Sequence, residues 1–366
     1  MSIKSRLLKR LDADIAASAG VAQAASLKVQ RALLMLRHGH MAAAREQLTA
    51  LHVQAFQHPH PEIGAWLHFA EGLMSYYTDF SSAAQEKIVH AQAMAKASAL
   101  AELDAMCSAW LAQLAYLRHD LDGMLAQAAA CDERAKADDH DARYRLCTVL
   151  GLAHDLTSRP DLSRDWYAKA RAHAQADGDD ASLSALMYNM AATRTAQVRR
   201  DSLSKGLVLR AELLLSADSI SHYDAAVGGS VQPELTPILR AQILTVEGDY
   251  ERARGLFEAH LPSTMAAGLA RWSSSLLADL AWCRVNLGQV EMGLQQAHEA
   301  ESELDALCDV DDRAATHSRL AQIYAALGDA AGAARHEEQA TAGWLEFAEQ
   351  QRLWAQALSQ SGLRPR

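Results

Sequence analysis

The chain has 366 residues, half of them hydrophobic, with only 19 glycines and 7 prolines, a composition that favours helices over strands. Its formal net charge of -10 gives no long-range attraction to phosphate backbones or anionic lipid, which argues against nucleic acid as the main partner. The five cysteines are far apart and form no C-x-x-C pair. We therefore expect neither a zinc knuckle nor a disulfide framework, and a reducing cytoplasm is the simpler location.

Residues 1–20 are predicted to form an N-terminal capping helix, because Leu7, Leu11 and Ile15 recur at helical spacing. No uninterrupted apolar stretch follows the basic residues of this segment, as a secretory signal would require. No stretch of the chain approaches the ~18 consecutive apolar residues of a membrane span, so stable membrane insertion is not expected. A helix lying on a membrane surface is the alternative for this segment.

An internal repeat is visible near the C-terminus, where the run that begins Gly248-Asp249 matches the run that begins Gly328-Asp329. Each run follows an apolar helical stretch, as a corner between two helices would. Aligned on this corner, eight positions recur at intervals of 39, 41, 41, 40, 48, 40 and 40 residues: His40, Asp79, Asp120, Asp161, Asp201, Asp249, Gln289 and Asp329. Most of them are acids, which is typical of helix N-caps.

A small or apolar residue follows four positions after the corner in six of the eight repeats: Ala44, Ala83, Met124, Ala253, Gly293 and Ala333. Such a residue lets two helices approach closely. Repeats four and five depart from this pattern, with Asp165 and Lys205 at the small position. The sequence thus predicts a repeat array over 21–347, and the end of the last helix with a tail over 348–366. The long interval predicts an irregular connection over 216–237 that contains Gly228, Gly229 and Pro233.

These residues resemble the tetratricopeptide-repeat superfamily, whose pattern has a Gly-Asp-Tyr corner followed by Ala and an aromatic residue. Gly248, Asp249, Tyr250, Ala253 and Phe257 match that pattern. The period near 40 is similar to the long-repeat branch of bacterial regulators and sensor arrays. The resemblance implies an all-α fold, a right-handed α-solenoid of about eight helical hairpins. It also implies that peptides, protein partners or small effectors bind on the concave face.

Catalytic signatures are absent from the sequence: there is no G-x-x-x-x-G-K loop, no H-E-x-x-H pair and no G-x-S-x-G elbow. Ser202 and Lys205 satisfy S-x-x-K, but without its companion motifs. His58 and His60 alternate with prolines and have no nearby Cys or acid cluster, so we expect no metal and no cofactor. The acid clusters at 138–141, 177–180 and 309–312 are expected to cap helices.

The resemblance places the first helix of each hairpin on the inner surface, where polar and aromatic side chains would bind a partner. The candidate positions, none of them catalytic, are His68, Tyr76, Gln113, Tyr116, His154, Asn189, Arg194, Gln242, Trp282 and Gln322. Arg194, Arg199 and Arg200, with Asn189, are predicted near the end of a helix, where they would receive an anionic group or simply complement the helix dipole.

The sequence therefore predicts a non-enzymatic, cytoplasmic scaffold that binds a protein or peptide. The alternative is a ligand-gated sensor in which a peptide or metabolite changes the curvature of the array. An enzyme is the third reading, disfavoured by the missing signatures.

Overall fold

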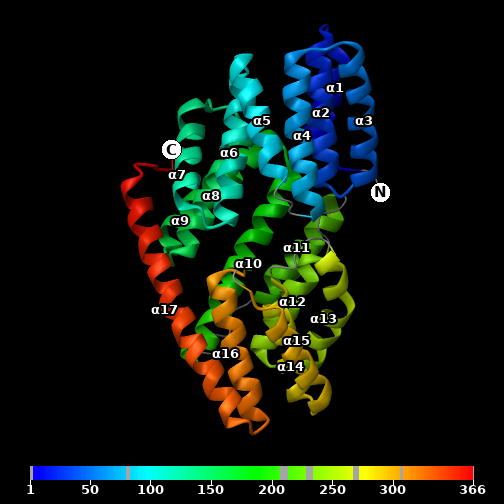
Figure 1. The fold of residues 1–366 in the computed structure, drawn as a ribbon. Helices are drawn as coiled ribbons and strands as arrows, with labels where there is room; N and C mark the ends of the chain where they lie inside the picture. The colour runs from blue at the N-terminus through cyan, green and yellow to red at the C-terminus, as the bar shows by residue number, and fades with distance from the viewer. Residues whose placement is uncertain are drawn as a thin grey trace. The chain divides into compact units, whose positions relative to one another are not determined.

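The computed structural model describes residues 3–79, 83–206, 213–227, 234–266, 272–305 and 308–365. Within these ranges the chain is entirely helical, without a strand, which confirms the predicted all-α class. The chain divides into two compact units (Figure 1). Unit 1 comprises residues 1–187, 222–232 and 354–366, and unit 2 comprises residues 188–221 and 233–353.

Unit 1 contains nine complete helices among the residues that the structure describes. They are α1 (Arg6–Ala17), α2 (Val21–Arg37), α3 (Met41–Gln57), α4 (Pro61–Asp79), α5 (Ala83–Ala97), α6 (Ala101–Leu117), α7 (Leu121–Arg134), α8 (His140–Leu156) and α9 (Pro160–Asp177). After α1, the helices pack as consecutive hairpins, α2 with α3, α4 with α5, α6 with α7, and α8 with α9.

Unit 2 continues the same plan. Its helices are α12 (Leu235–Glu247), α13 (Tyr250–Thr264), α14 (Ser273–Asn286), α15 (Val290–Ser302) and α16 (Val310–Ala326). Here α12 packs with α13, and α14 with both α15 and α16. Three helices have residues in both units: α10 (Asp180–Lys205), α11 (Leu213–Val227) and α17 (Ala330–Gln360). Consecutive helical pairs of this kind confirm the predicted α-solenoid. We call α2, α4, α6, α8, α12, α14 and α16 first helices, and their partners second helices.

One corner geometry recurs at the six corners between a first and a second helix that lie within the described residues. The corner residue adopts a left-handed backbone conformation, with φ between 55° and 84°, at Gly39, His119, Ser158, Gly248, Gly288 and Gly328. The amide of the next residue then donates to the carbonyl five positions earlier, as in Asp120 to Ala115 at 2.9 Å and Asp329 to Tyr324 at 2.9 Å. This bond satisfies a carbonyl that the end of the helix leaves free, and it stops the helix at a fixed residue.

The predicted acid caps are present at three of these corners. Asp120, Asp249 and Asp329 each accept a hydrogen bond from the amide three residues later. Two other predicted corners are wrong. Asp161 lies inside the first turn of α9, because the corner is at Ser158 and Arg159, and Asp201 lies within α10, which continues to Lys205.

The displaced fourth corner restores the repeat pattern. Four positions after Arg159 is Ser163, which is buried, whereas the predicted small position Asp165 is exposed. Ala44, Met124, Ala253 and Gly293 occupy the same buried place in their hairpins. Helices approach closely across these hairpins: a Cβ atom added to Gly151 of α8 would lie 2.4 Å from Cε1 of Tyr167 on α9.

The predicted irregular connection over 216–237 is also wrong for most of its length. Residues 216–227 belong to α11, and α12 begins at Leu235. Gly228, Gly229 and Pro233 lie outside the described residues. Leu7 and Leu11 of α1 are buried against Leu34 of α2, so the predicted N-terminal helix packs on the first hairpin. No helix of the described chain is both long and apolar enough to cross a membrane.

Replacing the cap Asp329 with Ala should lower the free energy of unfolding by ~1 kcal/mol, because the amide of Gly332 loses its acceptor at 2.9 Å. The matched control is Asp201→Ala, which removes only an ion pair with Lys205 within α10 and should change the free energy by less than ~0.5 kcal/mol. Urea denaturation followed by circular dichroism measures both. Equal effects of the two substitutions would contradict the capping assignment.

Candidate functional site

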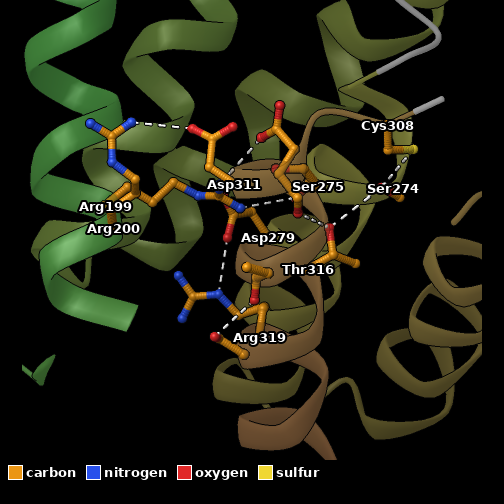
Figure 2. A network of polar contacts seen from close by, with 12 residues as sticks. Arg199, Arg200, Ser274, Ser275, Asp279, Cys308, Asp311, Thr316 and Arg319 are labelled. Carbon is orange, nitrogen blue, oxygen red and sulfur yellow. Dashed lines mark hydrogen bonds and ion pairs between the residues drawn. The ribbon is translucent and has the colours of Figure 1, made fainter. Parts of the chain in front are cut away.

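A buried ion-pair network joins three helices of unit 2 (Figure 2). Asp279 of α14 has no exposed surface, and its two carboxylate oxygens accept from Nε of Arg199 on α10 at 2.8 Å and Nε of Arg319 on α16 at 2.9 Å. Arg199 also donates to the carbonyl of Ser275 at 3.3 Å. One carboxylate thus holds two buried guanidinium groups.

Neighbouring acids complete the charge balance of this network. Arg199 lies 3.9 Å from Asp312, and Arg200 pairs with Asp311 at 3.2 Å. Burial and the charge of Asp311 raise the pKa of Asp312 to about 7. Burial lowers the pKa of Arg319, and the attraction of Asp279 only partly offsets it. Asp311 and Asp312, which the sequence assigned to helix capping, therefore pair with α10.

Two predicted binding residues of unit 2 contact this network. The guanidinium carbon of Arg319 lies 5.3 Å from the ring centre of Trp282, and its Nη1 donates to Gln322 at 2.7 Å. Both Trp282 and Gln322 are half-buried. Arg194 is exposed, Asn189 and Gln242 are half-buried, and Arg199 and Arg200 lie in the body of α10 rather than at its end. Of the three predicted arginines, Arg199 and Arg200 therefore form ion pairs within the protein.

In unit 1 an aromatic and polar cluster connects α4, α6 and α8. The ring of Tyr76 lies 5.3 Å from that of Trp110, with the planes near perpendicular. The guanidinium carbon of Arg145 lies 3.9 Å from the centre of the same indole, close enough for a cation–π interaction. Arg145 is 6% exposed, and no described residue places a carboxylate within ion-pair distance of it.

Gln113 lies one helical turn after Trp110 on α6 and is 4% exposed. Its side-chain carbonyl oxygen and Nε of Arg145 are both buried without a hydrogen-bond partner among the described residues. An unsatisfied buried polar atom costs roughly 1–3 kcal/mol. These two side chains therefore offer one hydrogen-bond acceptor and one donor that the described chain leaves unsatisfied. A bound amide could donate to the Gln113 oxygen and accept from Nε of Arg145, whereas a carboxylate could accept only from Arg145.

The other predicted residues of unit 1 lie outside this cluster. His68 packs against His90 with ring centres 4.5 Å apart, and Tyr116 packs against Trp354 at 5.9 Å. His154 is half-buried near the Ser158 corner, where burial and Arg159 lower its pKa. Of the five predicted positions in this unit, only Tyr76 and Gln113 belong to the cluster.

Sequence reasoning missed Trp110, Arg145, Asp279 and Arg319. A signal for three of them exists: each lies three positions before a residue that was predicted, Trp110 before Gln113, Asp279 before Trp282, and Arg319 before Gln322. Residues three apart share a helix face. Arg145 has no such signal, because its role depends on the neighbouring helix.

No family model matches the sequence, and no curated protein matches it either. In the part of the chain that the structure describes, no group of three or more His, Cys, Asp or Glu side chains could hold a metal ion.

The Asp279 network should dominate the stability of unit 2. Asp279→Asn leaves the buried Arg319 without a countercharge and Arg199 with only Asp312 at 3.9 Å, so we expect a loss of about 3–5 kcal/mol in the free energy of unfolding. Asp311→Asn breaks the more exposed pair with Arg200 and should cost ~1 kcal/mol or less. Denaturant unfolding of both variants measures the two losses in the free energy of unfolding. A loss for Asp279→Asn no larger than that for Asp311→Asn would show that the network does not hold α10 in place.

Proposed function

We propose that this chain is a tetratricopeptide-type helical repeat protein that binds a peptide or a segment of a partner protein through the first helices of unit 1. One observation carries the proposal: the cluster of Tyr76, Trp110, Gln113 and Arg145 combines aromatic surface with buried, unsatisfied polar atoms. Aromatic anchors together with a few fixed polar groups are typical of peptide- and ligand-binding sites.

The helical hairpins support this role because they place residues from successive first helices together. Tyr76 comes from α4, Trp110 and Gln113 from α6, and Arg145 from α8. An extended segment crossing these helices would meet a new set of side chains at each hairpin. The unsatisfied oxygen of Gln113 would accept from a main-chain amide, and Arg145 would donate to a carbonyl or carboxylate.

The function is proposed to be non-enzymatic, because the sequence carries no catalytic signature and the cluster has no nucleophile paired with a base. The net charge of -10 disfavours nucleic acid and anionic lipid as the partner.

The second candidate is a sensor that binds a small metabolite. It is favoured by a cavity of about 230 Å³ next to the cluster, which also contains Trp110 in its wall. A metabolite selective for the folded chain would raise the melting temperature with concentration, whereas a peptide scaffold would give no shift across a metabolite library.

Selection of phage-displayed random peptides against the full chain tests the first proposal. Enriched peptides should bind saturably in calorimetry, and Tyr76→Ala should weaken them about tenfold, because it removes an aromatic contact from the cluster. The matched control is Phe56→Ala, an aromatic truncation at a residue of the second helix α3 that is 89% exposed; it should leave affinity within about twofold. Failure to enrich any saturable binder, or equal effects of the two substitutions, would contradict the proposal.

A further inference from the structure

A cavity that is partly open to solvent lies among the first helices of unit 1, and we call it the N-terminal cavity. Its volume is about 230 Å³, below the ~300 Å³ at which pockets for drug-sized ligands begin. It has room for one side-chain head group or a small amine. Its wall comes from α1, α2, α4, α6, the start of α8 and the end of α9.

One part of the wall is aromatic and apolar. Trp66, Phe69 and Trp110 line it and are at most 5% exposed. Aromatic ring faces attract cations, and indole does so most strongly. Trp110 already demonstrates this in the structure, because the Arg145 guanidinium lies over it. Trp66 has no basic side chain over its ring in the described parts of the chain.

A second part of the wall is acidic. Six carboxylates line the cavity, against two basic side chains: Asp14, Glu102, Asp138, Asp139, Asp141 and Asp177, with Arg10 and Arg37. Both arginines already form ion pairs with carboxylates of the protein. Arg10 pairs with Asp177, and Arg37 pairs with Asp179 at 2.8 Å and lies 3.6 Å from Asp141.

Four of the lining carboxylates have no basic side-chain partner among the described residues: Asp14, Glu102, Asp138 and Asp139. The first three are exposed at the rim of the cavity, and Asp139 accepts from the backbone amide of Lys136. Burial raises the pKa of Glu102, and the charges of Asp139 and Asp141 raise it further. The acids therefore repel one another where no cation balances them. A cation entering the cavity would relieve that repulsion.

From this geometry we infer that the N-terminal cavity binds an organic cation, a guanidinium or ammonium group no larger than the head of an arginine or lysine side chain. The cation would lie against the aromatic wall, with Glu102 and Asp138 as its counter-charges. The inference rests on the proposed function and deepens it: the bound segment would be a basic one. A free amine metabolite carries the same chemistry and is the other source of such a cation.

Calorimetry with two probes tests the inference and separates the sources. The probes are agmatine, a free guanidinium compound, and the capped peptide Gly-Gly-Arg-Gly-Gly; a peptide with citrulline in place of arginine is their neutral counterpart. We expect saturable binding of at least one cationic probe, weakening as salt is added, and at least tenfold weaker binding of the citrulline peptide. Binding of agmatine alone would assign the cavity to a small amine, and binding of the peptide would assign it to a basic segment.

Charge-neutral variants locate the site. The double variant Glu102→Gln and Asp138→Asn keeps the shape of both side chains and should weaken the cationic probe at least tenfold. The matched control is Asp122→Asn, which removes an exposed carboxylate on α7, outside the cavity lining, and should change affinity by less than twofold.

The inference is overturned if neither cationic probe binds, if citrulline binds as well as arginine, or if Asp122→Asn weakens binding as much as the double variant. The proposed function is tested separately. Selected peptides that lose affinity on Tyr76→Ala would support peptide binding even if the cavity binds no cation.

Discussion

The hydrogen bond from the amide after each corner residue to the carbonyl five positions earlier is the constraint on which the repeat depends. It needs a residue in the left-handed conformation, which costs a non-glycine residue roughly 1–2 kcal/mol. His119 and Ser158 accept this cost at two corners. Because the first helices at the six described corners stop at equivalent residues, their second helices return in the same register, and a buried residue such as Ala44 or Ser163 recurs at the same position of the hairpin. The shared cluster and cavity of unit 1 follow from this repetition.

Much of this fold could be predicted from the sequence, because corners with Gly followed by Asp are local signals. Gly248 with Asp249 and Gly328 with Asp329 revealed the period directly. The fourth corner was misplaced by two residues because Ser158 carries no glycine signal, and Pro160 and Asp161 together imitate a helix start. The fifth corner was misplaced for a different reason. Asp201 is a plausible cap by residue type, but Arg199 and Arg200 hold that stretch of α10 in ion pairs with distant residues.

The candidate site was predictable only in part. The repeat period placed Tyr76, Gln113, Trp282 and Gln322 on first helices. The structure puts Tyr76, Trp282 and Gln322 beside charged or aromatic partners. Periodicity does not reveal which residue on a helix face contacts a side chain of another helix. The lone buried charge of Arg145 and the doubly bonded Asp279 both depend on neighbours more than thirty residues away, and Asp311 and Asp312 read as caps until their arginine partners are known.

The polar residues of the first helices are paired differently in the two units. In unit 2, Asp279 of the first helix α14 forms ion pairs with Arg199 of α10 and with Arg319 of the first helix α16. In unit 1, within the described part of the chain, Nε of Arg145 and the side-chain oxygen of Gln113 have no hydrogen-bond partner, and Glu102 of α6 has no basic partner. The central claim is that these first helices are the binding surface. Photo-crosslinking of a selected peptide that carries a benzophenone group, with the adducts mapped by mass spectrometry, tests it most directly. The account predicts adducts on α4, α6 and α8; adducts confined to the second helices α3, α5, α7 and α9 would contradict it.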